Sequence, residues 1–260
     1  MRTVAGLAAL VLLAGCVGSG QEPPRESLPD LDQALPGAIS IETRGGRRVL
    51  VFASAVDNVG AGALVIEGSR SSRAVDTMRI RQLVTTADGS TDVRSLPGRL
   101  RYVRSETHSH WHLLGFEHYS LRRASDGRLV APDRKTGFCL GDRYRIASPP
   151  PAAPPKAIWV RECGRGRTRL LRLRQGISPG YGDDYVPALE GQLVDLTGVP
   201  PGRYLLVHRV NADLSIRESN YENNAASVLL ELRGSSTVRI LARCPDSAAC
   251  GQGTDSAAAV

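Results

Sequence analysis

Long hydrophobic runs, aromatic side chains and lysine are all scarce in this chain of 260 residues. The apolar run from Val4 to Ala14 is shorter than the ~20 residues with which a helix crosses a bilayer. Aromatic residues make up 5% of the chain, and no recognition helix or stacking platform accompanies its net charge of +7. A nucleic-acid partner is therefore not expected. Lys135 and Lys156 are the only two lysines among the 33 basic residues.

Hydrophobic residues are sufficient for a folded core. They make up 42% of the chain, against 23% charged residues, which excludes a largely disordered protein. The length exceeds that of one average domain, but β-rich domains often pass 200 residues as one unit. A single folded domain is compatible with these values.

The N-terminus has the pattern of an export signal. Arg2 precedes the short apolar run, which ends in Leu13-Ala14-Gly15-Cys16. This ending resembles the lipobox of bacterial lipoproteins, in which the cysteine is acylated and becomes the mature N-terminus. We expect residues 1–16 to be a lipoprotein signal peptide, with the protein exported and anchored to the cell envelope through Cys16. An ordinary secretory signal is the alternative.

Four cysteines remain if Cys16 carries a lipid: Cys139, Cys163, Cys244 and Cys250. An even number in an oxidising compartment predicts two disulfides, for which three connectivities exist. We favour Cys139 with Cys163 and Cys244 with Cys250, because the members of each pair are closest in sequence.

The rest of the chain divides into a tether, a domain and a tail. Residues 17–35 are rich in Gly, Pro, Glu and Ser and are expected to form a flexible tether. Residues 36–245 are expected to form the folded domain, with a long loop at the prolines of 149–155. Residues 246–260 are small and polar, which predicts a disordered tail.

The domain has the pattern of short strands. No stretch has a sustained helical stripe of apolar residues, and Gly, Pro, Asn or Asp bounds each aliphatic segment. We therefore expect an all-β fold: an antiparallel β-sandwich in one domain with long loops. The expected strands are 49–55, 63–67, 78–85, 168–173, 192–196, 204–210 and 226–232.

Four of the five histidines fall within eleven residues, at 108, 110, 112 and 118. In His108-Ser109-His110-Trp111-His112 the period of two places three imidazoles on one face of a strand. The outer two Cα atoms of a straight strand would be ~13 Å apart, so a twist or bend is expected. Imidazole suits copper, zinc, iron and nickel. We expect His108, His110 and His112 to bind a metal, and a zinc hydrolase is one function open to such a site.

Several segments together resemble the lysyl oxidase family. The histidine run and the following Phe116-Glu117-His118-Tyr119-Ser120-Leu121 resemble the copper segment of that family, with spacing one residue shorter than in the animal enzymes. Further matches are the segments 135–140 (KTGFCL), 175–185 (QGISPGYGDDY) and 218–224 (ESNYENN). The resemblance covers roughly residues 48–232.

The resemblance implies a copper amine oxidase with a cofactor made from its own side chains. The family builds lysine tyrosylquinone from one tyrosine and one lysine, whose positions correspond to Tyr185 and Lys135. Copper on His108, His110 and His112 would activate oxygen for this oxidation. In a chain that otherwise uses arginine, Lys135 supplies the primary amine that a quinone requires, which a guanidinium cannot replace.

The implied reaction converts primary amines, either peptidyl lysine or small amines, to aldehydes with release of ammonia and hydrogen peroxide. The reaction also needs a base, and the candidates are the four acids near Tyr185 in sequence: Asp183, Asp184, Glu190 and Asp195. Tyr181 and Gly191 stand where the animal enzymes have two cysteines, so one bridge of that family is missing. The main alternative is a non-catalytic, copper-binding envelope lipoprotein, which would not depend on Lys135 or Tyr185.

Overall fold

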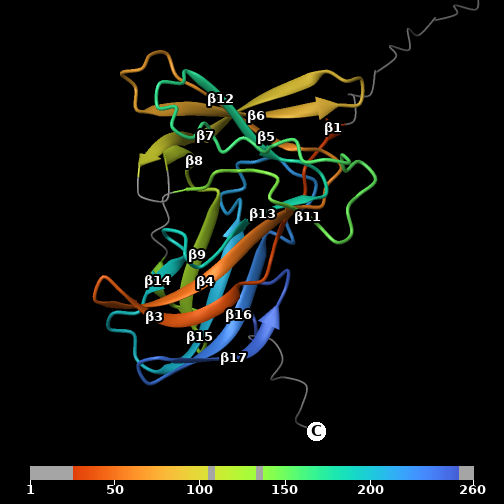
Figure 1. Ribbon diagram of the computed structural model, residues 1–260. Coiled ribbons are helices and arrows are strands. Elements are labelled where there is room, and N and C mark those ends of the chain that lie inside the picture. The colour runs from red at the N-terminus through yellow and green to blue at the C-terminus, as the bar shows by residue number, and fades with distance from the viewer. Residues whose placement is uncertain (1–25, 105–108, 133–136, 252–260) are drawn as a thin grey trace, which may run out of the picture.

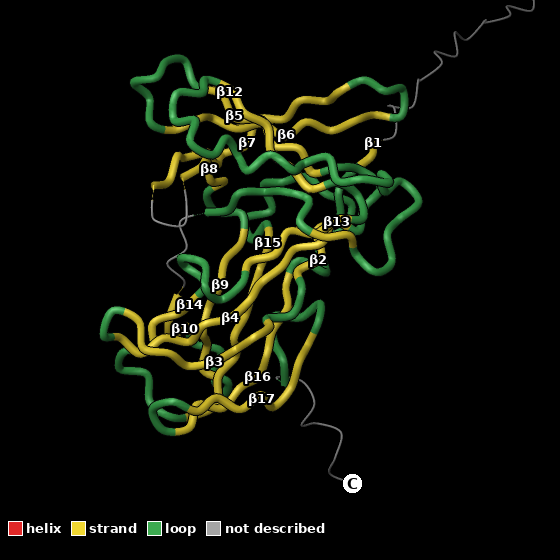
Figure 2. Tube along the Cα trace, in the orientation of Figure 1, coloured by secondary structure: helices red, strands yellow, loops and turns green. Residues whose placement is uncertain are grey.

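The computed structural model describes residues 26–104, 109–132 and 137–251 (Figure 1). Within these ranges the regular elements are all β-strands, drawn in yellow in Figure 2, and every pair of neighbouring strands is antiparallel. The prediction of an all-β antiparallel fold is confirmed. No helix in the described part of the chain is long and apolar enough to cross a membrane.

One sheet lies at the top of the molecule in Figures 1 and 2. Its strands run in the order β12 (Arg172–Ile177), β5 (Leu64–Ser69), β6 (Thr77–Thr86), β7 (Thr91–Arg104) and β8 (Ser109–Leu113), and β1 (Glu26–Ser27) also pairs with β6. β6 follows the alternation of a half-buried strand, since Met78, Ile80 and Val84 are buried between exposed or partly exposed neighbours. β8 ends this order and is the strand that the alternating histidines predicted.

Two further sheets pack face to face below the first. One has the order β10 (Leu129–Pro132), β9 (Glu117–Arg123), β15 (Gly202–Val210), β16 (Ala225–Arg233) and β17 (Thr237–Cys244). The other is built on β4 (Arg47–Asn58), which pairs with β13 (Tyr181–Tyr185), β14 (Leu193–Asp195), β2 (Leu31–Gln33) and β3 (Gly37–Arg44), while β11 (Tyr144–Arg145) pairs with β13. The ring of Phe52 on β4 meets that of Tyr119 on β9 with centroids 4.8 Å apart, so the core of a sandwich lies between these sheets.

Most expected strands coincide with observed ones, but the strand placed at 168–173 is wrong. β12 begins only at Arg172, because the preceding segment turns across the end of the first sheet. There the amide of Gly166 donates to the Ser109 carbonyl at 2.7 Å, and the amide of Arg167 donates to the Gly164 carbonyl at 2.9 Å. These turn contacts keep the chain from the extended path that its leucines suggested.

The folded part extends beyond the expected boundaries at both ends. Leu31, expected in the tether, is fully buried, and β2 pairs with β4. At the other end Cys250 is buried and bonded to Cys244, so the fold continues past residue 245. Apolar burial therefore overrides the local composition in residues 26–35 and 246–250. The expected signal peptide, Cys16 and the rest of the tether and tail lie outside the described residues.

Candidate metal centre and cofactor site

β8 carries two of the expected metal ligands. His110 and His112 are 5% and 4% exposed, and they share one face of the strand, while Trp111 between them points the other way and is fully buried. β7 pairs with one edge of β8. On the other edge the amide of Trp111 donates to the Cys163 carbonyl at 3.0 Å, and Leu113 exchanges two backbone hydrogen bonds with Phe138. Both edges are thus held, which fixes the direction of the two imidazoles.

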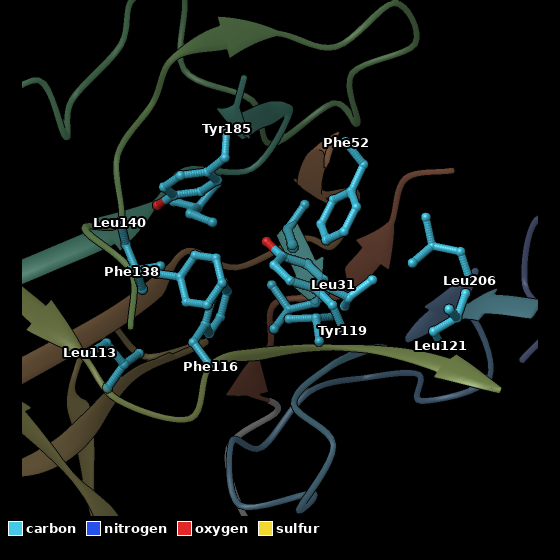
Figure 3. Close-up of a cluster of buried hydrophobic side chains, with 14 of the residues drawn as sticks. Leu31, Phe52, Leu113, Phe116, Tyr119, Leu121, Phe138, Leu140, Tyr185 and Leu206 are labelled. Atoms are coloured by element: carbon cyan, nitrogen blue, oxygen red, sulfur yellow. The ribbon is translucent and has the colours of Figure 1, made fainter. Parts of the chain in front are cut away.

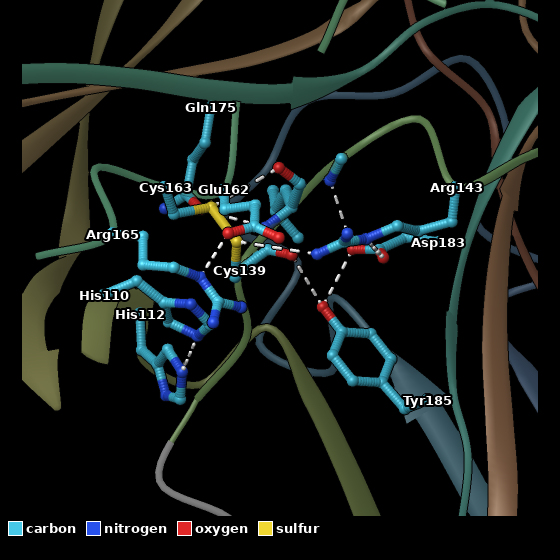
Figure 4. Close-up of a disulfide and its surroundings, with 12 residues drawn as sticks. His110, His112, Cys139, Arg143, Glu162, Cys163, Arg165, Gln175, Asp183 and Tyr185 are labelled. Atoms are coloured by element: carbon cyan, nitrogen blue, oxygen red, sulfur yellow. Dashed lines mark hydrogen bonds and ion pairs between the residues drawn. A yellow bond between two sulfur atoms is a disulfide. The ribbon is translucent and has the colours of Figure 1, made fainter. Parts of the chain in front are cut away.

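The two imidazoles of β8 lie in contact with each other. Their Nε2 atoms lie 2.8 Å apart, which is within hydrogen-bond distance, and the ring planes are tilted by 43° with centroids 4.7 Å apart (Figure 4). Two nitrogens that bind one ion at right angles, each about 2.0 Å from it, lie about 2.8 Å apart, and such tetragonal nitrogen sites are typical of copper(II). His108 lies outside the described residues. Within the described ranges no three His, Cys, Asp or Glu side chains are grouped as a metal site.

Tyr185 is held rigidly at the end of β13. It pairs with Ser54 of β4. Its ring meets Phe138 edge-on, with centroids 5.0 Å apart, and belongs to the cluster of buried hydrophobic side chains drawn in Figure 3. Its hydroxyl donates a hydrogen bond that Oδ2 of Asp183, 2.8 Å away, and the Cys139 carbonyl oxygen, 2.9 Å away, share as acceptors. Burial and the nearby Asp183 carboxylate raise the pKa of the Tyr185 phenol well above its usual value.

Asp183 is the buried partner of that phenol. Its side chain is fully buried, and burial raises the pKa of the carboxyl to about 8, although the phenol and the guanidinium of Arg143 both act to lower it. Arg143 places Nε 3.5 Å from Oδ1, and the amide of Gly141 donates to Oδ2 at 3.2 Å. Asp183 can therefore accept or release a proton near neutral pH while it holds the phenol in place.

Two disulfides connect the cysteines as predicted, Cys139 to Cys163 and Cys244 to Cys250. The first lies beside the histidines and Tyr185 (Figure 4). The Cys139 carbonyl accepts a hydrogen bond from the Tyr185 hydroxyl, and the Cys163 carbonyl accepts one from the amide of Trp111 on β8. This disulfide therefore ties together the two loops that hold the phenol and the histidine strand.

A single cavity brings these residues together. It has a volume of about 290 Å³, and its walls include His110, His112 and Tyr185, with the Cys139 segment between them. Gly137 also lines it and is the first described residue after the gap that contains Lys135. Lys135 itself lies outside the described residues. The structure thus unites three of the five predicted site residues.

The acids considered from the sequence separate into different positions. Asp183 accepts the hydrogen bond of the Tyr185 phenol, and Asp184 lines the cavity with an exposed side chain. Asp195 instead receives the amide of Thr197 at 2.8 Å and lies outside the cavity wall, as does Glu190. The exposed His118 also lies outside the wall, on β9.

Sequence reasoning missed two features that support the site. Arg143 lines the cavity and pairs with Asp183, although the two residues are 40 positions apart and the sequence carries no signal of the contact. Behind Tyr185, the buried carboxylate of Glu117 receives hydrogen bonds from Gln33 at 2.8 Å and Tyr119 at 3.0 Å. His208 lies beside this carboxylate, and burial lowers the pKa of its imidazole to about 3. Glu117 and Tyr119 belong to the segment that resembles the family, but nothing in the sequence places Gln33 or His208 beside them.

Comparison with known proteins identifies the family of this chain. A family model described as lysyl oxidase matches residues 61–244, which include the histidine strand, both cysteines of the first disulfide and Tyr185. The chain belongs to the lysyl oxidase family. This family generally depends on copper and lysine tyrosylquinone.

Individual members of the lysyl oxidase family show moderate identity. The chain is 33% identical over 145 residues to a protein-lysine 6-oxidase of Sus scrofa, which covers 54% of this chain and 51% of that protein. It is 34% identical over 135 residues to protein-lysine 6-oxidase of Homo sapiens, covering 50% of this chain and 28% of that protein. Lysyl oxidase homolog 1 of Homo sapiens is 30% identical over 145 residues, with 54% and 22% covered. The match therefore spans about half the length of these relatives or less.

Proposed function

We propose that this protein is a copper- and quinone-dependent amine oxidase. It converts primary amines, either protein lysyl groups or small amines, to aldehydes and releases ammonia and hydrogen peroxide. One observation carries the proposal: the Tyr185 phenol and the facing imidazoles of His110 and His112 line one cavity. A protein that only stores copper would have no use for a fixed, buried phenol beside its metal ligands.

The residues for both groups are present in the chain. His110 and His112, together with His108, would hold copper, and Tyr185 with Lys135 would form lysine tyrosylquinone. When present, these groups supply a carbonyl that accepts two electrons from the amine and a route by which oxygen removes them. The remaining steps of binding, orientation and proton transfer belong to ordinary side chains.

Asp183 and Arg143 prepare the phenol. Asp183 accepts a hydrogen bond from the Tyr185 hydroxyl at 2.8 Å and is placed to take its proton when the ring is oxidised. Arg143 lies 3.5 Å from the other carboxylate oxygen and favours the ionised form of Asp183, which is the form that can accept this proton. The Cys139 carbonyl keeps the hydroxyl directed into the cavity.

The cavity wall suits an amine at the end of an apolar chain. Two arginines of the wall are paired with carboxylates, Arg143 with Asp183 and Arg165 with Glu162. Asp184 places an exposed carboxylate on the same wall, which would attract an ammonium group, and Val186 and Leu189 provide apolar contact nearby. A volume of about 290 Å³ admits an aliphatic amine or one lysyl side chain but not a folded domain. A protein substrate would therefore present its lysine on a mobile or protruding segment.

The decisive assay measures hydrogen peroxide released from butylamine in air by the full chain after copper loading. Tyr185→Phe should retain copper and lose peroxide release, because phenylalanine lacks the phenol that becomes the cofactor. Tyr221→Phe is the matched control, since Tyr221 is exposed and lies outside the cavity wall, and it should keep the activity. Equal peroxide release from wild type and Tyr185→Phe would overturn the proposal.

A further inference from the structure

A second cavity lies behind the histidine strand. It has a volume of about 500 Å³, and its lining shares no residue with the cavity of His110, His112 and Tyr185. Trp111 forms part of its wall, because alternation along β8 turns this side chain away from the two histidines. We call it the arginine cavity, because five arginines and one acid line it: Arg70, Arg73, Arg101, Arg104, Arg169 and Asp76.

Arg70 makes one wall of the arginine cavity rigid. Its guanidinium donates to the carbonyls of Val75 at 2.6 Å, Thr168 at 2.6 Å and Leu170 at 2.8 Å, and it lies 4.8 Å from the ring centre of Trp111. These contacts join the segment before β6 to the segment before β12. The backbone around the cavity is thus fixed before any ligand arrives, which lowers the cost of binding.

The other four arginines leave the arginine cavity with an excess of positive charge. Arg73, Arg101, Arg104 and Arg169 are exposed, and none forms an ion pair with a carboxylate of the described residues. Elsewhere on the same sheet the guanidiniums of Arg81 and Arg174 approach the buried Glu67 within 2.5 and 2.7 Å. The arginine cavity lacks such a buried carboxylate, and Asp76 alone cannot balance five guanidiniums.

We propose that the arginine cavity binds a phosphate-bearing anion with more than one negative charge. Guanidinium groups match phosphate oxygens with paired hydrogen bonds, and several of them around one concavity favour a multiply charged group over a single carboxylate. Arg70 covers Trp111, and the guanidinium of Arg104 lies 5.8 Å from the ring centre of Tyr102. The aromatic faces are therefore occupied by arginine, so the ligand is held by its charge and not by stacking of a base.

Titration calorimetry of the full chain with pyrophosphate at low, constant ionic strength tests this proposal. Pyrophosphate should bind at one site, and Arg73→Gln/Arg169→Gln should weaken binding about tenfold, since two exposed charged contacts are lost. These two side chains have no structural partner among the described residues, unlike Arg70. Arg239→Gln/Arg243→Gln removes the same charge from exposed positions on β17 and should leave the affinity unchanged.

Two results would overturn the proposal. One is the absence of saturable pyrophosphate binding. The other is an equal loss of pyrophosphate affinity in both double variants, which would show that the anion is attracted only by the net charge of the protein. Thermal unfolding of each variant verifies that it is folded.

A vesicle flotation assay distinguishes a phosphate on a lipid headgroup from a soluble phosphate. Binding to phosphatidylcholine vesicles that contain phosphatidic acid, displaced by pyrophosphate, would identify a lipid headgroup, whereas binding of pyrophosphate without vesicle binding would identify a soluble phosphate. The Tyr185→Phe variant should bind pyrophosphate like wild type, so this proposal and the proposed oxidase activity can fail independently.

Discussion

At the residue scale, we predict that metal binding depends on the histidines of β8. Replacing His110 by Ala should weaken copper binding by more than tenfold, because even residues that only orient a metal ligand are worth about 10- to 100-fold in affinity. Copper content after dialysis, measured by atomic absorption, reports this loss. His118→Ala is the control, since His118 is exposed on β9 and outside the cavity wall, and it should retain copper. Unchanged copper affinity in His110→Ala would contradict the assignment.

Asp183 is the residue that should set the rate of cofactor formation. Asp183→Asn should retain copper but slow the appearance of the quinone absorbance at least about 100-fold, because an amide cannot accept the phenol proton. In wild type this rate should rise as pH increases through about 8, where burial has placed the pKa of the Asp183 carboxyl, and the variant should lose that dependence. Asp184→Asn, one residue away and exposed, should form the quinone at the wild-type rate.

Stopped-flow absorbance after copper addition measures both effects. A wild-type rate of quinone formation in Asp183→Asn would remove Asp183 from the proton transfer and leave it a packing role.

At the scale of single elements, the pairing of β2 with β4 contains an unfavourable contact. Asp32 lies directly opposite Asp57, and burial, followed by Asp246, Asp57 and Asp30, raises the pKa of the Asp32 carboxyl to about 6. A carboxyl with a raised pKa in the folded state costs stability once it ionises. The cost is absent below the ordinary pKa of 3.8 and is complete above about 6.

Asp32→Asn should therefore stabilise the protein at pH 7 and give no gain at pH 3.5. Because Asp32 is only half-buried, solvent screening reduces the gain to about 1 kcal/mol, or about 2–4 °C in Tm. Asp92→Asn is a control on β7, where the exposed side chain should change Tm little. Thermal unfolding at the two pH values measures this difference in Tm. An equal gain in Tm at both values would show that the charge of Asp32 does not cause the stabilisation.

Some strands could be predicted from the sequence pattern and others could not. Aliphatic segments such as 49–55 and 204–210 were predictable because apolar burial and turn residues mark their limits. β7 was not, since Leu100 is its one fully buried hydrophobic side chain and pairing with β6 and β8 holds the strand in place. β13 was missed for a similar reason, because its sequence YGDDY is polar and only its pairing with β4 makes it a strand.

The site was predictable where one motif contained it. His110 and His112 follow from alternation, and Tyr185 follows from the family resemblance. The contact of Arg143 with Asp183 was not predictable, because each is an ordinary loop or turn residue in sequence and the fold alone brings them within 3.5 Å.

At the scale of the whole molecule, attachment to a membrane remains a prediction from the N-terminal sequence. The wild-type chain expressed in a bacterial host should incorporate a fatty-acid label, and Cys16→Ser should lose it, because the thiol is the acylated group. Cys139→Ser retains Cys16 and serves as the control for loss of a cysteine. A label that persists in Cys16→Ser would place the lipid elsewhere.

The central claim is that the fold joins residues 50 positions apart in sequence, Lys135 and Tyr185, into one cofactor beside the histidines. Peptide mass spectrometry of the full chain after copper loading in air tests it most directly. We expect one peptide in which the segments of Lys135 and Tyr185 are cross-linked, with a phenylhydrazine adduct on that peptide. Neither product should form in Lys135→Arg, which should still bind copper. Fully copper-loaded wild type with both segments unmodified and no adduct would contradict the account.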